Sequence, residues 1–336
     1  MRRLLVVLAL SIFLLGTLAL VPLASSAEAR PAVARLYLGV AGDPGRFQGQ
    51  TGQASTIKSA YIGWDQGRTY ATRLPVLLRQ LGPIPMLHIG TGGPLGKSEA
   101  ITPLQIAQGK GDAFLVALNE AIASYGSLVY LRLLSEMNHF SHFHSAFNAN
   151  GSSRGPAYRP EVYRKMFARM YLLLHGGQAA KIDSVLKRLG LPPYAGADLA
   201  PLPPTRLRII WNPLGGGQPE SEANRFYRFY PGDRYLELVG NDIYGAFGQY
   251  AGPQNEVLYA FARAHRKPFA LPEFGVRGSD YPAFIHYVCK FVRTHGGIEL
   301  AAYYKSQAGG LYDLSNKPAS TQAYRKCITP LGRKAP

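Results

Sequence analysis

The sequence predicts an α/β fold, a single (β/α)8 barrel that occupies residues 30–336 of the 336-residue chain. Short apolar runs alternate with longer amphipathic runs, which is the pattern of repeated strand–helix units. Eight strand candidates can be placed, and the chain length fits one barrel. An open, doubly wound sheet is the alternative. It is disfavoured because the first strand runs into Gly42-Asp43-Pro44, a turn that ends in proline, where a glycine-rich phosphate loop would open a helix.

Residues 1–29 are predicted to form a secretory signal peptide. Two arginines precede the nearly all-apolar run Leu4–Ala24, and the pattern Ala27-x-Ala29 is typical of a cleavage site. An uncleaved anchor is the alternative, because the run is long enough to span a bilayer. Both interpretations leave the arginines in the cytoplasm and place the barrel outside. We therefore expect a secreted protein, or one held outside the membrane by this segment alone.

The amino-terminal half of the predicted barrel contains four strands bounded by turn residues. They are expected at Leu36–Val40, Ala60–Trp64, Ile84–Ile89 and Leu128–Leu134. Helices are expected at Thr72–Gln80, Pro103–Ala107 and Asp112–Tyr125. A long loop rich in polar and aromatic residues, 141–160, follows the fourth strand.

The carboxyl-terminal half supplies the other four strands. They are expected at Leu207–Trp211, Leu236–Ile243, Phe269–Leu271 and Ile298–Tyr303. Helices are expected at Pro160–Leu174, Ala179–Leu189, Asn255–His265 and Tyr281–Thr294, and residues 191–204 are proline-rich and irregular.

The net charge of +17 would suit an anionic partner such as nucleic acid, anionic lipid or an acidic polysaccharide. The basic residues are scattered, however, with no run of five or more, and the predicted export argues against nucleic acid. Cys289 and Cys327 are the two cysteines. They can pair in an oxidising compartment, although sequence alone does not show that their Cα atoms are close enough.

Two glutamates stand where predicted strands meet their loops. Glu136 follows the fourth strand and Glu273 follows the seventh. Barrel active sites lie at the carboxyl ends of the strands, so these side chains would face each other across the mouth. Cleavage of a glycosidic bond requires such a pair, one carboxyl group as acid and one as nucleophile or base. A single glutamate at a strand end is usually solvated or ion-paired, so the prediction depends on the two together.

The segments around both glutamates resemble glycoside hydrolase family 26, the β-mannanase family of the retaining (β/α)8 clan. The matching motifs are Arg132 with Ser135-Glu136-Met137-Asn138-His139, Ile210-Trp211-Asn212-Pro213, Asp233, Asp242-Ile243-Tyr244 and Pro272-Glu273-Phe274-Gly275. The resemblance covers the chain from about Gly39 to Tyr324. It implies Glu136 as the acid/base and Glu273 as the nucleophile, with Tyr244 hydrogen-bonded to the nucleophile.

The chain departs from the family pattern at two places. Ser135 stands where the family has histidine, and His139 stands where it has glycine. The family also presents a tryptophan near the end of strand eight as a sugar platform, whereas residues 302–306 contain none. Tyr304 is the candidate replacement. Mannan specificity is therefore left open, while the carboxylate chemistry is expected to be retained.

Further substrate contacts are expected around the mouth of the barrel. Arg132 shares a strand face with Glu136, and it either holds a carboxylate charged or forms a structural ion pair. Asn138 either binds sugar or the nucleophile, or caps a loop. The remaining candidates are chosen by position and aromatic or polar character: Trp64, His88, His139, Phe140, Trp211, Tyr244 and Tyr304. A tryptophan at a strand end is also often part of the core.

The spacing of His139, His142 and His144 raises the possibility of a metal site. Phenylalanines interleave with these histidines, which favours a sugar-contacting loop. We therefore expect no metal and no cofactor.

Together these features predict a secreted, monomeric, retaining endo-β-glycanase that resembles a mannan endo-1,4-β-mannosidase and acts on β-linked polysaccharide. One alternative is a non-catalytic carbohydrate-binding barrel that uses the same groove. Another is a hydrolase of the producer's own envelope glycans, to which a basic surface would be suited.

Overall fold

A computed structural model describes residues 35–246, 249–250 and 252–335. The predicted signal peptide lies outside these ranges and stays a prediction. The described residues form one compact unit. Within the described ranges, no helix is long and apolar enough to cross a membrane.

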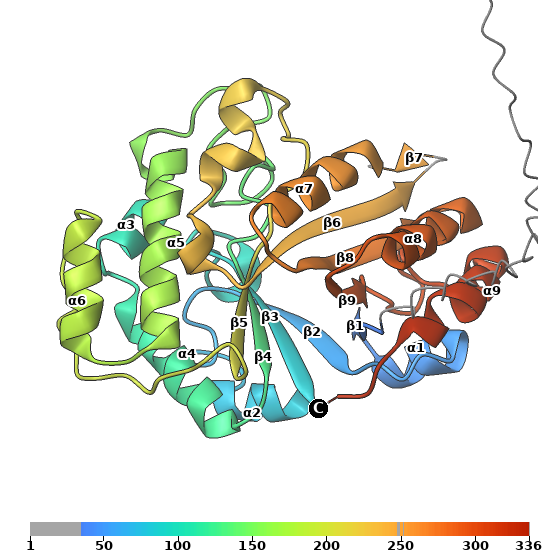
Figure 1. Ribbon diagram of the computed structural model, residues 1–336, viewed down its shortest axis with the longest axis horizontal. Coiled ribbons are helices and arrows are strands. Elements are labelled where there is room, and N and C mark those ends of the chain that lie inside the picture. The colour runs from blue at the N-terminus through green and yellow to red at the C-terminus, as the bar shows by residue number, and fades with distance from the viewer. Residues whose placement is uncertain (1–34, 247–248, 251, 336) are drawn as a thin grey trace, which may run out of the picture. The chain divides into compact units, whose positions relative to one another are not determined.

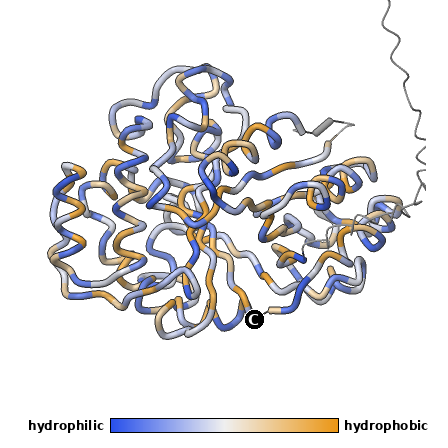
Figure 2. Tube along the Cα trace, in the orientation of Figure 1, coloured by the Kyte–Doolittle hydropathy of each residue, from blue (hydrophilic) through white to orange (hydrophobic). Residues whose placement is uncertain are grey.

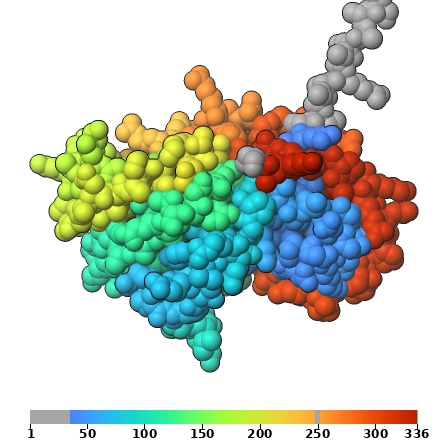
Figure 3. Space-filling view, turned by 90° about the horizontal axis from the view of Figure 1, so that it is seen from below, coloured from blue at the N-terminus to red at the C-terminus, as the bar shows by residue number. Residues whose placement is uncertain are grey.

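Eight parallel strands close into a barrel with helices outside it (Figure 1), which confirms the predicted fold. The barrel strands are β1 (Tyr37–Ala41), β2 (Ile57–Ile62), β3 (Ile84–Ile89), β4 (Val129–Leu133), β5 (Leu207–Trp211), β6 (Leu238–Ala246), β8 (Phe269–Arg277) and β9 (Ile298–Tyr303). Pairing of β1 with β9 and of β5 with β6 closes the circle, and β7 (Gln249–Tyr250) pairs antiparallel with β6. Figure 3 shows the blue amino-terminal and red carboxyl-terminal segments adjoining on the surface, as this closure requires.

The α-helices lie along the outside of the barrel (Figure 1). They are α1 (Pro44–Thr51), α2 (Leu74–Gln80), α3 (Pro103–Ala107), α4 (Asp112–Tyr125), α5 (Pro160–His175), α6 (Ala179–Arg188), α7 (Gly252–Ala264), α8 (Pro282–Thr294) and α9 (Pro318–Cys327). Short 3-10 helices occur at Pro94–Gly96, Pro156–Tyr158, Glu222–Asn224, Phe226–Phe229, Asp233–Tyr235 and Thr329–Leu331.

The core has two layers because successive strand residues point to opposite sides. On β4, Leu131 and Leu133 pack outward in the layer between strands and helices. Tyr130 packs inward with residues of the other strands. Figure 2 shows the predominantly hydrophobic strands at the centre of the molecule. The alternation places Arg132, the next inward residue after Tyr130, inside the barrel near its carboxyl end.

The expected turn at residues 42–45 is wrong, because α1 begins there. The Asp43 side chain caps this helix by accepting hydrogen bonds from the backbone nitrogens of Gly45 and Arg46 at 2.9 and 3.1 Å. Pro44 occupies the first helical position, where its missing N–H costs nothing. Pro44, which the sequence analysis interprets as evidence against a helix start, is therefore the first residue of α1.

Two strand boundaries and one helix also differ from expectation. β2 begins at Ile57 and ends at Ile62, so Trp64 lies beyond the strand. β8 continues past Leu271 to Arg277, because its residues pair with β6 through Arg277. Glu273 therefore stands inside a strand. Helix α9, which the sequence reading omitted, follows the loop after β9.

Cys289 and Cys327 form a disulfide that joins α8 to α9, with their Cα atoms 5.9 Å apart. The pairing that the sequence left open is thus present in the structure. It fixes the last helix of the chain to the outside of the barrel.

Candidate active site

Arg132 connects three strand ends at the mouth of the barrel. Its guanidinium donates to Glu273 on β8, to Asp242 on β6, and to Asn212 Oδ1 just after β5 at 2.9 Å. The side chain is only 1% exposed. Burial acts to lower the pKa of Arg132, but the carboxylates of Asp242 and Glu273 outweigh it and raise the pKa. The arginine is therefore a permanent buried cation that gathers the acidic groups of the site.

Glu273 has both carboxylate oxygens engaged by donors. Arg132 donates to Oε1 and the Tyr244 hydroxyl donates to Oε2. Burial and the charge of Glu273 raise the pKa of Tyr244 well above its usual value, so this tyrosine keeps its proton. These two contacts fix the orientation of the Glu273 carboxyl group at the mouth of the barrel.

Glu136 has an unusual backbone conformation, with φ at 53°. Its backbone nitrogen donates to Asn212 O at 2.7 Å, which ties the end of β4 to the end of β5. Left-handed backbone at a residue other than glycine is unfavourable and concentrates at functional sites. The turn directs the Glu136 side chain toward the groove and keeps it 16% exposed.

His142 contacts the Glu136 carboxylate, with His142 Nε2 and Glu136 Oε2 separated by 2.8 Å. Burial acts to raise the pKa of Glu136, but the hydrogen bond and charge of His142 outweigh it, and the pKa falls to about 2. In the unliganded site Glu136 is therefore ionised beside a histidine.

Asp242 lies between the two glutamates. It is 4% exposed, accepts from Arg132 through Oδ2 and shares a hydrogen bond with the Glu136 carboxyl group. Burial raises its pKa well above the usual value, and the charges of Glu273 and Glu136 add to this despite the opposing effect of Arg132. Among the described residues no hydrogen-bond partner reaches Asp242 Oδ1. Glu136, Asp242, Arg132 and Glu273 thus form one continuous network.

Tyrosines surround this network at the mouth. The Tyr304 ring lies 5.9 Å from Tyr61, 5.4 Å from Tyr244 and 4.9 Å from Tyr312. His88 lies 5.6 Å from Tyr61. Aromatic faces of this kind are suited to stacking on sugar rings.

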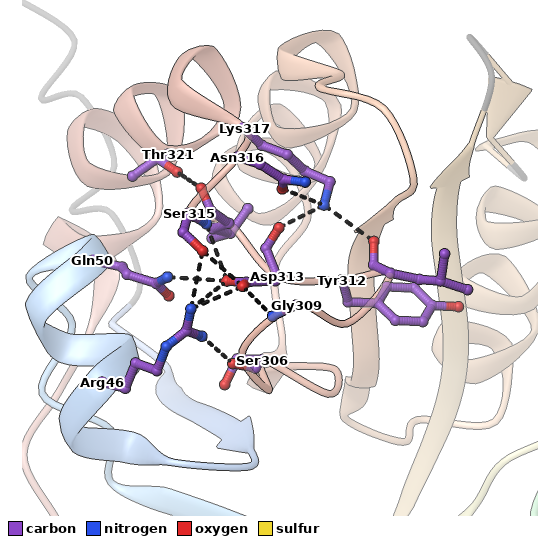
Figure 4. Close-up of polar contacts among 12 residues, drawn as sticks. Arg46, Gln50, Ser306, Gly309, Tyr312, Asp313, Ser315, Asn316, Lys317 and Thr321 are labelled. Carbon is purple, nitrogen blue, oxygen red and sulfur yellow. Dashed lines mark hydrogen bonds and ion pairs between the residues drawn. The ribbon is translucent and has the colours of Figure 1, made fainter.

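The loop after β9 carries Tyr312, and a polar cluster holds that loop against α1 (Figure 4). Asp313 accepts hydrogen bonds from Arg46 at 2.8 Å and from Gln50, Gly309 and Ser315. The buried ammonium of Lys317 donates to the carbonyls of Leu311 and Asp313. Tyr303 donates to the carbonyl of Tyr312 at 2.9 Å. Tyr312 is consequently held on both sides along the backbone.

A groove of about 1340 Å³ opens beside the network. Glu136 and Asp242 lie in its wall, together with His139, Phe140, Tyr227, Tyr244 and Tyr312. The loop after β5, residues 214–220, forms the opposite part of the lining.

Several predicted contacts lie in or beside this site. Tyr244 and Tyr304 stand next to Glu273, and His88 stands at the mouth. His139 and the exposed Phe140 line the groove. No group of three or more potential metal ligands occurs in the part of the chain that the structure describes.

Four expected contacts do not face the groove. Trp64 is 5% exposed, packs on Phe114 and lines a separate cavity of about 270 Å³. Trp211 is fully buried in an aromatic cluster outside the barrel, because alternate residues of β5 point outward. Asn138 uses its amide to bind the backbone nitrogen and oxygen of Leu214, so it caps a loop. Arg132 is too deeply buried to meet sugar directly.

Four residues that the structure brings to the site are not among the individual site residues predicted from the sequence, namely Tyr61, Asp242, His142 and Tyr312. Asp242 carried a usable signal, because it lies two residues before Tyr244 and therefore on the same face of β6. The sequence places His142 in a sugar-contacting loop, with a metal ligand as the alternative, and does not indicate its contact with Glu136. Tyr312 gave no signal, because its place depends on contacts between α1 and the loop after β9.

The fold places the chain among (β/α)8 barrels, with one glutamate just after β4 and another within β8 at the mouth of the barrel. Its structure is similar to a Bacillus subtilis mannanase (20% identity, 87% of this chain and 85% of that one, TM-score 0.55). It is also similar to a modular endo-β-1,4-mannanase from Cellulomonas fimi (13% identity, 90% and 72%, TM-score 0.60). A third similar structure is a GH26 β-mannanase from Bacteroides ovatus (15% identity, 87% and 88%, TM-score 0.57). No family model and no curated protein sequence matches the chain.

Proposed function

We propose that this protein is a secreted, retaining endo-β-glycanase of the β-mannanase type. The observation that carries the proposal is the different environment of two carboxylates joined by one network. Glu273 is held by an arginine and a tyrosine, whereas Glu136 meets a titratable histidine and the groove. Glycoside cleavage uses two carboxyl groups in different roles, one as acid/base and one as nucleophile.

In the proposed reaction Glu273 attacks the anomeric carbon while Glu136 protonates the leaving oxygen. A covalent glycosyl-enzyme results. Glu136 then removes a proton from water, which attacks the same carbon and releases Glu273. Arg132 and Tyr244 orient Glu273 and stabilise its negative charge before attack and after release. No cofactor is needed for either step.

β-Mannan is the first substrate to test, because the similar structures described above are mannanases. The absence of tryptophan among residues 302–306 puts the sugar platform on tyrosines instead. Tyr304 and Tyr312 provide that surface, and it adjoins both Tyr244 and the groove. A β-linked glucan or xylan is the next substrate class.

The test is hydrolysis of β-mannan, β-glucan, xylan and an acidic glycan by the protein and by its Glu136→Gln and Glu273→Gln variants. Each substitution removes one ionisable group with little change of shape. We expect one polymer to be cleaved, and both variants to lose activity by roughly 10³-fold or more. Binding without cleavage by the unmodified protein would replace the proposal with a carbohydrate-binding barrel.

Secretion forms part of the proposal and rests on the sequence of residues 1–29. Amino-terminal sequencing of protein recovered from the medium checks it. We expect the mature chain to begin just after Ala29, and a membrane-bound product that retains Leu4–Ala24 would indicate an anchor instead.

A further inference from the structure

We propose that His142 is the positioning residue of the acid/base Glu136 and holds the proton that Glu136 delivers to the leaving group. This inference rests on the proposed function and adds a residue to its mechanism. The observation behind it is the direct contact of His142 Nε2 with Glu136 Oε2 at 2.8 Å.

The loop after β4 fixes the His142 ring from several sides. His142 stacks on His144, with ring centroids 5.2 Å apart and planes 17° from parallel. His144 is itself anchored, because its Nε2 bonds the backbone oxygen of Ser135 at 2.9 Å. Arg154 donates to the backbone oxygen of His142 at 2.6 Å and to that of Phe143 at 3.0 Å. This stacking and these hydrogen bonds therefore hold the His142 imidazole against Glu136.

Three other histidines lie nearby, and their surroundings favour the neutral form. Burial lowers the pKa of His144 to about 3. Burial and the adjacent Arg132 lower the pKa of His88 well below its usual value, and burial also lowers the pKa of His139. These rings contribute shape and polarity, while His142 is the one bonded to a carboxylate at the mouth.

The charged groups that face the pair come from three strands and the loop. Arg132 on β4, Asp242 on β6 and Glu273 on β8 lie behind Glu136, and Arg154 lies behind His142. Asp242 is 4% exposed, whereas the side chains of Glu136 and His142 are 16% and 30% exposed. Within the pair, His142 is therefore the side chain more open to solvent.

The proton balance of the reaction follows from this arrangement. In the proposed cycle the Glu136–His142 pair enters with one proton, held across the 2.8 Å contact. When a glycan enters, the proton passes from His142 Nε2 to Glu136 and then to the glycosidic oxygen, as the C1–O bond breaks and Glu273 bonds C1. In the second step Glu136 takes a proton from water and passes it to His142 while the water oxygen replaces Glu273 on C1. The histidine ends each cycle as it began.

The experiment compares His142→Phe, which keeps the stacked ring, and His142→Gln, which keeps a donor, with the unmodified protein. His295→Gln is the matched control, because His295 Nε2 lies 2.9 Å from Glu256 Oε2 in an exposed pair, and neither residue lines the groove. The first readout is the carboxyl ¹³C titration of Glu136, which needs no activity. We expect the Glu136 pKa to rise by roughly one unit or more in His142→Phe and to stay unchanged in His295→Gln.

The second readout is kcat/KM on the polymer and on an aryl glycoside with an activated leaving group, which departs without protonation. We expect His142→Phe to lose roughly tenfold or more on the polymer and less than about threefold on the aryl glycoside. In His142→Gln the alkaline limb should move to lower pH, because Glu136 must then hold the proton alone.

An unchanged Glu136 titration in His142→Phe overturns the proposal whether or not the protein is an enzyme. Equal losses on both substrates also overturn it, because they would show a structural role. If the titration shifts but the unmodified protein cleaves no glycan, the proposed function fails while the Glu136–His142 pair stands.

Discussion

The Arg132 guanidinium and the Glu273 carboxylate form an ion pair in which both side chains are more than nine-tenths buried. A buried pair of this kind is costly to break, because removal of one partner leaves an uncompensated charge away from water. The same contact that supports the proposed nucleophile is therefore also a part of the fold.

Replacing Arg132 with methionine should lower both stability and activity. We expect a loss of about 3–5 kcal/mol in the free energy of unfolding, because Glu273 and Asp242 lose their common counter-ion. Urea denaturation measures this loss. Arg228→Ala is the control, since its pair with Glu222 is exposed and contributes at most about 1 kcal/mol. Similar stability for the two variants would contradict the assigned role of Arg132.

Tyr244→Phe should reduce catalysis with little effect on folding. The variant removes a hydrogen bond to the charged Glu273 and keeps the ring. Such bonds contribute about 1.5–3 kcal/mol, so kcat/KM should fall by roughly 10- to 150-fold. Steady-state kinetics at constant pH test this. A fall in thermal stability without a fall in kcat/KM would mean that Tyr244 serves the fold and not the reaction.

Lowering the pH should weaken the hydrogen bonds by which Asp313 holds the loop that carries Tyr312. Burial acts to raise the pKa of Asp313, but hydrogen bonds from Ser315, Gly309 and Gln50 outweigh it and lower the pKa. A lowered folded-state pKa contributes stability above the unfolded value of about 3.9, and this contribution is lost as the pH falls below it. The stability difference between the protein and Asp313→Asn should be about 1–3 kcal/mol at pH 7 and shrink on acidification. Unfolding curves at several pH values measure it, and a constant difference would refute the argument.

Loss of the disulfide should cost stability while leaving the active site intact. The Cys289–Cys327 bridge closes a 38-residue separation, which corresponds to about 4 kcal/mol in the chain-entropy model. A Cys289→Ser/Cys327→Ser variant should unfold at lower denaturant concentration and keep its kcat/KM at 25 °C. Lost activity in the folded variant would show that α9 influences the site through its packing on α1.

The periodicity of the sequence was sufficient to predict the barrel, because eight apolar runs separated by turns are compatible with few other folds. It failed at α1, where Pro44 was taken as a helix breaker although Asp43 caps a helix that begins there. It also shortened β8, because Pro272 and Glu273 interrupt the apolar run while the β6 pairing continues. Local patterns do not report such tertiary pairing.

The two glutamates could be placed at strand ends from the sequence, but their partners depend on distant parts of the chain. His142 reaches Glu136 through a loop with no periodic signal, and Tyr312 is placed by contacts with α1. The predicted positions of the two tryptophans were wrong for a different reason. Aromatic character at a strand end does not say which face the residue occupies, and both Trp64 and Trp211 face the core.

The central claim is that Glu273 is the nucleophile of a retaining glycosidase, and trapping the glycosyl-enzyme tests it most directly. The protein would be incubated with a 2-deoxy-2-fluoro-glycoside of the sugar identified by the polymer panel, digested and analysed by mass spectrometry. We expect one sugar unit on the peptide that contains Glu273, and none in Glu273→Gln. Label on another carboxylate, or hydrolysis with inversion at the anomeric carbon and no label, would contradict the account.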